Sequence, residues 1–162
     1  MRDESYTATM ASPLGPICLT GTAKGLTSVD FQHGHRPVLP SSDGCRCSDM
    51  LDEAMRQLQA YFDGTGQGFT VPLAPHGTPF QHRVWQVLQQ IPFGMTTTYQ
   101  EVAVQLGMPK GARAVGSANG RNPIAIMIPC HRVLGQDGRL RGYAGGLSIK
   151  RRLLQHEGAW LI

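Results

Sequence analysis

A stretch dense in glycine and proline, DGTGQGFTVPLAPHG at residues 63–77, constrains the fold of this 162-residue chain more than any other feature. Such residues favour turns and end helices and strands, so the stretch separates one lobe from another. The charge balance changes at the same place. Residues 1–76 carry five Lys and Arg against eight Asp and Glu, whereas residues 77–162 carry ten against three. We therefore expect two domains, residues 1–76 and residues 77–162, the first acidic and the second strongly basic.

The first lobe combines a strand pattern with a helix pattern. Apolar and polar residues alternate around GPICLTGTAKGLTSVDF, residues 15–31, which predicts a β-hairpin or a short meander. Residues 33–48 are rich in turn formers and predict a loop. Ser48 can then cap a helix that runs to about Phe62. The residues expected on the inner face of this helix are Leu51, Met55, Leu58 and Phe62.

The second lobe opens with a capping box. Thr78 pairs with Gln81, and Pro79 suits the first helical position, so a helix is expected to begin here and to end before Pro92. The residues expected to face inward are Phe80, Val84, Leu88 and Ile91. This lobe is therefore expected to start on a helix rather than a strand.

A second capping box, Thr98 with Glu101, starts a short helix that Gly107 stops. Another helix is expected over residues 110–118. Its sequence, KGARAVGSANG, is thin, because glycine, alanine and serine dominate it and each glycine costs about 1 kcal/mol relative to alanine. Two short helices joined by a tight turn are the helix-turn-helix pattern. The thin helix brings its backbone close either to another helix or to a narrow groove of DNA, where Arg113 would reach a phosphate or enter the base stack.

The charge of the second lobe bears on its partner. Ten positive against three negative side chains attract a polyanion, which favours nucleic acid. A membrane surface is disfavoured because the basic residues are scattered over several segments rather than gathered on one amphipathic helix. The N-terminus is polar, and no apolar run approaches the roughly 20 residues that span a bilayer. We expect a cytoplasmic protein without a membrane segment.

Cys130 follows an apolar run, PIAIMIP at residues 123–129, that is typical of a buried strand. An inert core thiol is one interpretation and a nucleophile is the other. His131 is adjacent in sequence, but neighbours on a strand point to opposite sides, so adjacency alone does not place the imidazole against the sulfur. A base for the thiol needs an orienting group. Glu157 is the candidate, since it lies on the face marked by Ile149, Leu153 and Leu154 of the last expected helix.

The remaining patterns are weaker. Residues 138–152 contain glycines and Tyr143, whose ring offers a face for stacking a base, but no phosphate-binding glycine motif is present. The four cysteines are unevenly spaced and predict reduced thiols rather than a disulfide framework. The pairs His33 with His35 and Cys45 with Cys47 do not match a common zinc spacing, so we expect no metal.

The segments IPCHRV, TTTYQEVA, GARAVGSANGRNP, GYAGG and LLQHEG together resemble the O6-alkylguanine-DNA alkyltransferases, also called methylated-DNA-protein-cysteine methyltransferases. The likeness is continuous over about residues 78–158 and extends weakly through SPLGP and AYFDG in the first lobe. It implies an α+β protein with a small N-terminal antiparallel sheet of ribonuclease-H-like type and a C-terminal helical lobe with a winged-helix-like helix-turn-helix. The implied function is DNA repair by a single, irreversible transfer of an alkyl group to the protein, without a cofactor.

The resemblance also assigns roles. Cys130 would accept the alkyl group, with His131 as a base acting through water and Glu157 holding His131. Asn122 would brace the turn around the cysteine. Tyr99 would donate a hydrogen bond to the departing guanine, and the Val133 carbonyl would help recognise the base. Arg113 would fill the space left by a nucleotide flipped out through the minor groove. The other expected contacts of substrate and DNA are Tyr143, Ala144, Lys150, Ala112 and Ser117.

The implied partner is double-stranded DNA carrying O6-alkylguanine, with O4-alkylthymine as a second substrate, and the implied state is a monomer. Two other functions stay open from the residues themselves. One is a damage sensor that flips and holds a lesion without reacting. The other is a cysteine hydrolase built from Cys130, His131 and Glu157, which the basic, thin-helix lobe disfavours.

Overall fold

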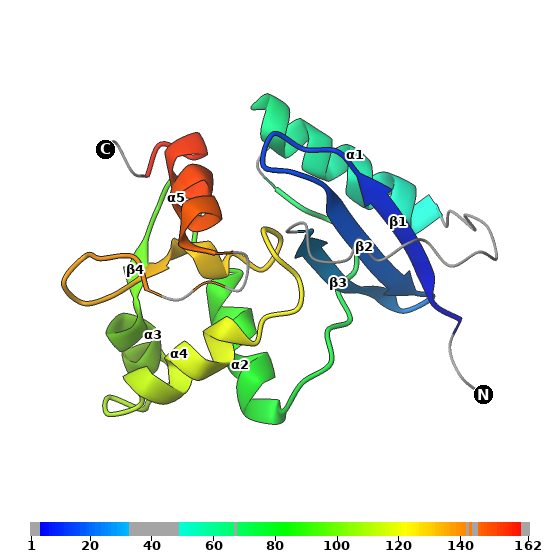
Figure 1. Ribbon diagram of the computed structural model, residues 1–162. Helices are drawn as coiled ribbons and strands as arrows, with labels where there is room; N and C mark the ends of the chain where they lie inside the picture. Colours follow the sequence, from blue (N-terminus) through cyan, green and yellow to red (C-terminus); the bar gives the residue numbers. More distant parts are fainter. Residues whose placement is uncertain (1–3, 33–48, 67, 142, 144–145, 160–162) are drawn as a thin grey trace. The chain divides into compact units, whose positions relative to one another are not determined.

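A computed structural model describes residues 4–32, 49–66, 68–141, 143 and 146–159. The chain forms two compact units, residues 1–76 and residues 77–162. Strands dominate the first unit and helices the second (Figure 1). The expected α+β class is confirmed. Within the described residues, no helix has the length and apolar character needed to cross a membrane.

The first unit contains an antiparallel meander of three strands, β1 (Tyr6–Met10), β2 (Ile17–Thr22) and β3 (Gly25–Phe31), in the order β1-β2-β3. The expected meander over residues 15–31 is therefore confirmed, and β1 extends it. Gly25 opens β3 with a φ of 142°, and a Cβ there would lie 2.5 Å from the Pro72 carbonyl oxygen. This close approach allows the backbone of Leu26 to pair with that of Leu73.

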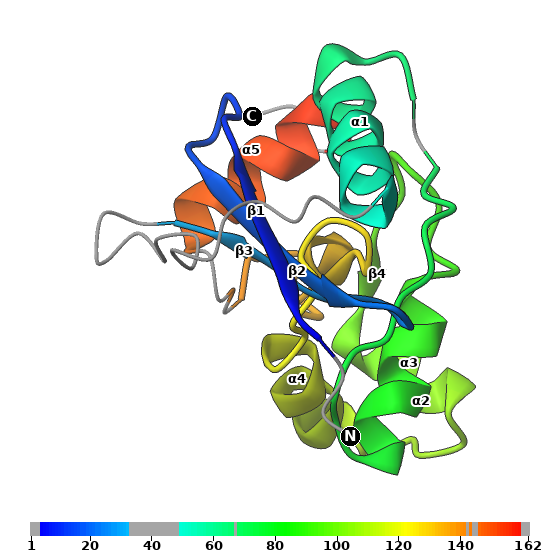
Figure 2. The same cartoon turned by 90° about the vertical axis from the view of Figure 1, so that its right-hand side faces the viewer.

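Helix α1 (Asp49–Asp63) packs on this sheet and contacts all three strands (Figures 1 and 2). Its buried residues are Leu51, Ala54, Leu58 and Tyr61. Leu51 and Leu58 were expected, but Met55 and Phe62 are half-buried. Ala54 and Tyr61 are buried in their place, because positions i+3 and i+4 flank the same helical stripe and the spacing alone does not choose between them. The expected cap, Ser48, lies outside the described residues, as does the loop at residues 33–48.

Both expected capping boxes of the second unit are confirmed. The Thr78 hydroxyl accepts from the Gln81 backbone N–H at 3.1 Å and starts α2 (Pro79–Leu88), while the Gln81 side chain accepts from the Thr78 N–H. Thr98 and Glu101 make the same pair of bonds at the start of α3 (Tyr99–Gln105). Helix α2 ends earlier than expected, and Trp85 rather than the half-buried Phe80 shares its inner face with Val84 and Leu88.

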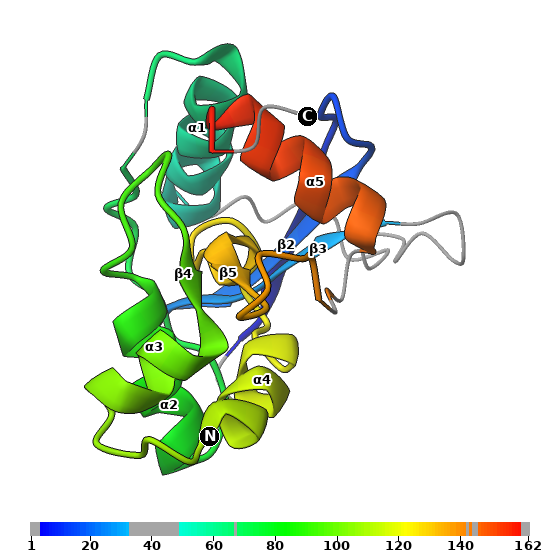
Figure 3. The ribbon, with the colours of Figure 1, turned by 90° about the vertical axis from the view of Figure 1, so that its left-hand side faces the viewer.

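Helix α4 (Ala112–Gly120) follows α3 after a turn at Gly107, which has a φ of 74°. The helix begins and ends two residues later than expected. Helices α2, α3 and α4 lie against one another (Figure 3). The Trp85 indole N–H donates to the Ala118 carbonyl at 2.9 Å, which ties α2 to α4 inside the core. The small residues Gly116 and Gly120 are not required by this packing, since an added Cβ meets only ordinary contact with Tyr99 at Gly116 and nothing within 4 Å at Gly120.

The strand expected over residues 123–129 is wrong. This segment is a series of buried turns, with Ile126 at a φ of 69°. The Asn122 side chain causes them: its amide donates to the carbonyls of Ile124 at 3.2 Å and Ile128 at 2.8 Å, and its oxygen accepts from the Ile124 N–H at 2.9 Å. A side chain that bonds its own backbone in this way competes with a strand ladder.

The chain continues into a 3-10 turn, η1 (Cys130–Arg132), and the short strand β5 (Val133–Leu134), which pairs in parallel with β4 (Thr97–Thr98) (Figure 3). Helix α5 (Leu147–His156) packs on η1. Cys130 therefore lies where segments distant in sequence meet.

Replacing Trp85 by Phe removes the N–H that satisfies the Ala118 carbonyl and leaves that acceptor buried. We expect the free energy of unfolding in urea to fall by about 1–3 kcal/mol, the typical cost of an unsatisfied buried polar group. Gln86→Ala, at an exposed position on the same helix, is the control and is expected to have little effect. Equal stabilities of the two variants would contradict the role given to the indole.

Candidate active site

Cys130 occupies the first position of η1 and is 5% exposed. Burial raises the pKa of its thiol, while a hydrogen bond with the Asn122 side chain and the positive charge of Lys150 act in the opposite direction. Two groups that stabilise a thiolate thus reach a sulfur that burial alone would leave inert.

The most densely bonded group nearby is the Glu157 carboxylate, at the C-terminal cap of α5. Its Oε2 lies 2.6 Å from His131 Nε2. Arg132 donates from Nε to Oε1 at 2.7 Å and from Nη2 to Oε2 at 3.0 Å, and its Nη1 donates to the Ile91 carbonyl at 2.7 Å. The expectation that Glu157 lies on the inner face of the last helix is therefore confirmed.

His131 is completely buried, and its ring is held as a neutral base. Burial lowers its pKa below the ordinary value, and this outweighs the opposing effect of Glu157, whose charge is shared with Arg132. Because Nε2 faces a carboxylate, the proton of the neutral ring sits on Nε2. Nδ1 is buried without a hydrogen-bond partner among the described residues, so its lone pair is free to accept a proton.

Lys150 of α5 is also fully buried. Its Nζ donates to the Val133 carbonyl at 2.7 Å and to the Arg141 carbonyl at 2.9 Å, and lies 5.9 Å from the centre of the Tyr99 ring. Burial lowers its pKa to about 8, while the nearby Cys130 opposes the shift. The ammonium thus fixes two backbone segments beside the cysteine.

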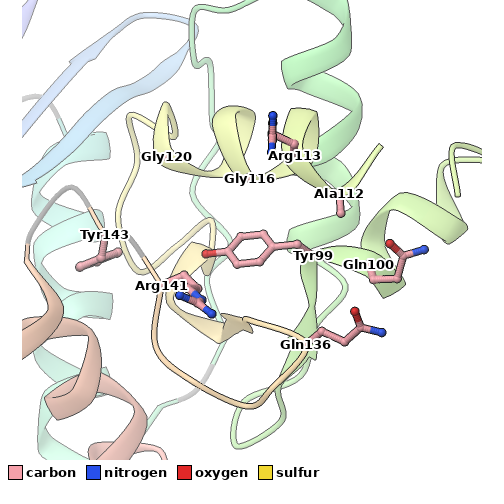
Figure 4. Close-up of a pocket in the computed structure, with 9 residues that line it drawn as sticks. All are labelled: Tyr99, Gln100, Ala112, Arg113, Gly116, Gly120, Gln136, Arg141 and Tyr143. Carbon is pink, nitrogen blue, oxygen red and sulfur yellow. The ribbon is translucent and has the colours of Figure 1, made fainter. Parts of the chain in front are cut away.

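A cavity of about 870 Å³ opens in this unit. Figure 4 shows the Tyr99 ring lying beside α4, with its hydroxyl directed toward the side where Arg141 and Tyr143 lie. Burial raises the pKa of both tyrosines, and the charge of a Cys130 thiolate raises each further. The residues lining the cavity are Tyr99, Gln100, Ala112, Arg113, Gly116, Gly120, Gln136, Arg141 and Tyr143.

The structure brings most of the expected residues into two connected groups. The first lies at η1 and α5. Asn122 and Lys150 act on the Cys130 thiol, His131 pairs with Glu157, and Lys150 also binds the Val133 carbonyl. The second lines the cavity and consists of Tyr99, Arg113, Ala112 and Tyr143. Ser117 is exposed on α4 but does not line the cavity. Ala144 lies outside the described residues.

The sequence reasoning missed two buried polar residues. Arg132 donates to Glu157. The sequence offered a signal for this contact, because a lone charged residue inside an apolar run requires a partner when it is buried. Asn119 is 2% exposed and donates to the Cys130 carbonyl at 3.4 Å. A polar residue on the inner face of α4 could have suggested it.

Within the described ranges, no three His, Cys, Asp or Glu side chains gather where they could hold a metal ion. The pairs considered as zinc ligands, His33 with His35 and Cys45 with Cys47, lie outside those ranges.

A buried cysteine, whose thiolate Asn122 and Lys150 favour, shares a basic unit with two short helices joined by a tight turn, and this combination points to the class of DNA-binding proteins that carry a reactive cysteine. The comparisons agree. Residues 79–159 match the family model described as 6-O-methylguanine DNA methyltransferase, DNA binding domain, and residues 5–75 match its ribonuclease-like domain. The chain belongs to the 6-O-methylguanine DNA methyltransferase family, and the resemblance seen in the sequence is confirmed.

Relatives match over nearly the whole chain. A methylated-DNA-protein-cysteine methyltransferase of Methanosarcina barkeri is 51% identical over 152 residues, which cover 94% of this chain and 96% of that protein. Its counterpart in Mycobacterium leprae is 48% identical over 149 residues, covering 91% and 89%. The crystal structure of Mycobacterium tuberculosis OGT in complex with DNA aligns with a TM-score of 0.81 at 44% identity, covering 93% of this chain and 91% of that one.

The lowered pKa of His131 makes stability depend on pH. In the unfolded chain the imidazole takes up a proton below about pH 6.5, whereas the buried ring resists it, so stability is lost as the pH falls below that value. We expect the free energy of unfolding to fall by about 1 kcal/mol more between about pH 7.5 and pH 5.5 in the unmodified protein than in His131→Gln. Urea titrations at both pH values measure this, and parallel pH dependences would contradict it.

Proposed function

We propose that this protein repairs DNA by moving an alkyl group from O6 of guanine to the sulfur of Cys130, once per molecule. The observation that carries the proposal is a buried cysteine whose thiol is bonded by Asn122 and which is followed directly by a histidine paired with a carboxylate. It lies in the same unit as a cavity that two tyrosines and the thin helix line. A thioether has no easy route back, so the reaction is stoichiometric. Relatives named methylated-DNA-protein-cysteine methyltransferases support the same chemistry.

The proposed proton path begins at the Cys130 thiol. His131 accepts the proton at Nδ1 through a water molecule, while Glu157 holds the ring and balances the charge that it gains. Asn122 and Lys150 favour the thiolate that remains. The thiolate then forms a bond to the alkyl carbon, the bond from that carbon to O6 breaks, and its electron pair stays on the purine. The purine takes up one proton, so that guanine is restored.

Base flipping follows from the depth of the sulfur. An alkylated O6 inside a duplex cannot reach a buried thiol, so the nucleotide must leave the stack, at a cost of a few kcal/mol. We assign α4 to the minor groove, which is about 6 Å wide and suits a slim helix. Packing within the unit does not require glycine at Gly116 or Gly120, which supports an external reason for their small size. Ala112 and Ser117 would face the groove, and Arg113 would fill the vacated space.

Recognition of the flipped base is assigned to groups around the cavity. Tyr99 donates a hydrogen bond to the purine as negative charge develops on it. The Val133 carbonyl keeps one lone pair beside the bond from Lys150 and accepts from the base. Tyr143 forms part of the wall of the cavity, and Ala144, which lies outside the described residues, stays an expected contact of the base. The same arrangement would accept O4-alkylthymine as a second substrate.

We assign different tasks to the two domains. Residues 1–76 form an N-terminal α/β domain, and residues 77–162 form the domain that binds DNA and accepts the alkyl group. The protein acts as a monomer in the cytoplasm on double-stranded DNA, without a cofactor. A solved relative in complex with DNA supports the partner.

The direct test is to incubate the protein with duplex DNA that carries a single O6-methylguanine and to weigh the protein and its peptides. We expect one methyl group per molecule, on the peptide that contains Cys130, and none in Cys130→Ala. Cys18→Ala is the matched control, because Cys18 is also a buried free thiol, and it is expected to react like the unmodified protein. Lesion binding without any gain in mass would instead identify a damage sensor.

A further inference from the structure

The loop after β5, residues 135–141, holds an arginine in the cavity. Arg141 lines the cavity, and its Nη2 donates to Asp137 Oδ2 at 3.0 Å. A Cβ added to Gly135 would lie 2.9 Å from Arg141 Nε and 2.8 Å from Asp137 Oδ1, so the pair folds back over a position that only glycine leaves open. The backbone N–H of Arg139 donates to Asp137 Oδ1, and this bond leads the effects that lower the pKa of Asp137. Asp137 is therefore an anion at neutral pH.

The backbone of Arg141 is fixed as firmly as its side chain. Its carbonyl accepts from the buried Lys150 Nζ at 2.9 Å, and the same Nζ binds the Val133 carbonyl. One ammonium thus ties the arginine to the segment that follows the cysteine. Lys150 thus holds the Arg141 backbone, while Asp137 bonds the guanidinium of a side chain that is 58% exposed.

The charged and titratable groups that face the Tyr99 hydroxyl differ in sign. Burial raises the pKa of Tyr99, Cys130 raises it further, and Arg141 lowers it. Lys150 lies over the ring of the same tyrosine. Arg141 lines the same cavity as Tyr99, and Figure 4 shows it on the side to which the Tyr99 hydroxyl points, so its guanidinium can stabilise negative charge in the space beside this hydroxyl. A guanidinium carries five N–H donors, and the bond to Asp137 leaves others available.

We propose that Arg141 is a catalytic residue that stabilises the negative charge on the purine as the alkyl group leaves it. The inference rests on the proposed function. As sulfur bonds to the alkyl carbon and the bond from that carbon to O6 breaks, the electron pair moves onto the purine. Arg141 and Tyr99 face that charge together, and the proton that finally neutralises it replaces the one lost by the thiol. An arginine bound to a DNA phosphate is the competing role, and it predicts no effect on a free base.

The matched control lies in the same loop. Arg139 pairs with the same aspartate at 3.7 Å, but its side chain is 81% exposed and does not line the cavity. Arg139→Leu and Arg141→Leu each remove one positive charge from the loop. The effect of position is thus separated from the effect of net charge.

The experiment measures the rate at which free O6-benzylguanine benzylates Cys130 in the unmodified protein, Arg141→Leu, Arg139→Leu and Arg141→Lys. We expect Arg141→Leu to slow the reaction about ten-fold, the scale of one lost charge-assisted hydrogen bond. Arg139→Leu should react at the unmodified rate, and Arg141→Lys should recover part of the loss. O6-benzyl-8-azaguanine, which releases a more acidic purine, should lose less in Arg141→Leu, because the departing anion needs less stabilisation.

Equal rates of Arg141→Leu and Arg139→Leu on the free base would overturn the inference, as would equal losses on both purines. A loss confined to duplex DNA would identify a phosphate contact and would also overturn it. The proposed function is tested separately, by methyl transfer from duplex DNA. If the unmodified protein takes that methyl group but no benzyl group, the proposed function stands and the four proteins are compared on free O6-methylguanine, where equal rates of Arg141→Leu and Arg139→Leu overturn the inference. If Arg141→Leu does not fold, Arg141→Lys is compared with the unmodified protein on both purines. The inference predicts that the ratio of the two rates differs between these proteins, whereas a purely structural role of Arg141 predicts equal ratios.

Discussion

The second unit depends on one buried carboxylate. Glu157 joins the end of α5 to the turn that carries the cysteine, because it binds both His131 and Arg132. A charge buried this deeply is tolerated only when its lone pairs are satisfied, and removing one partner of such a pair typically costs about 3–5 kcal/mol. Arg132 extends the connection to the Ile91 carbonyl after α2. The same contacts that hold the unit together therefore fix the protonation of the histidine.

This arrangement explains how a fully buried thiol can be a nucleophile. Burial raises the pKa of Cys130, and groups from two separate segments act in the opposite direction: Asn122 after α4 and Lys150 on α5. Asn122 also shapes the backbone turns that precede the cysteine. The same side chains thus serve both the packing of the unit and the state of the thiol, and Lys150 also lies over the ring of Tyr99, which lines the cavity.

Much of this could be predicted from local sequence patterns. The capping boxes at Thr78 and Thr98 are short-range signals. The spacing of Glu157 from Leu153 and Leu154 correctly predicted that Glu157 lies on the inner face of its helix. The predicted strand before Cys130 failed because apolar, β-branched residues suit a buried turn as well as a strand, and the deciding bonds come from the Asn122 side chain. The partnership of Arg132 with Glu157 spans 25 residues, and no periodicity reports a contact between segments so far apart.

The protonation state of the His131 ring tests the proposed proton path from Cys130 most directly. Nitrogen-15 NMR of histidine-labelled protein at neutral pH separates the two tautomers and the imidazolium. The proposed mechanism predicts a neutral ring with the proton on Nε2 and no proton on Nδ1. Only that form donates to Glu157 and can still accept the proton of the thiol. A proton on Nδ1, or a doubly protonated ring, would contradict it.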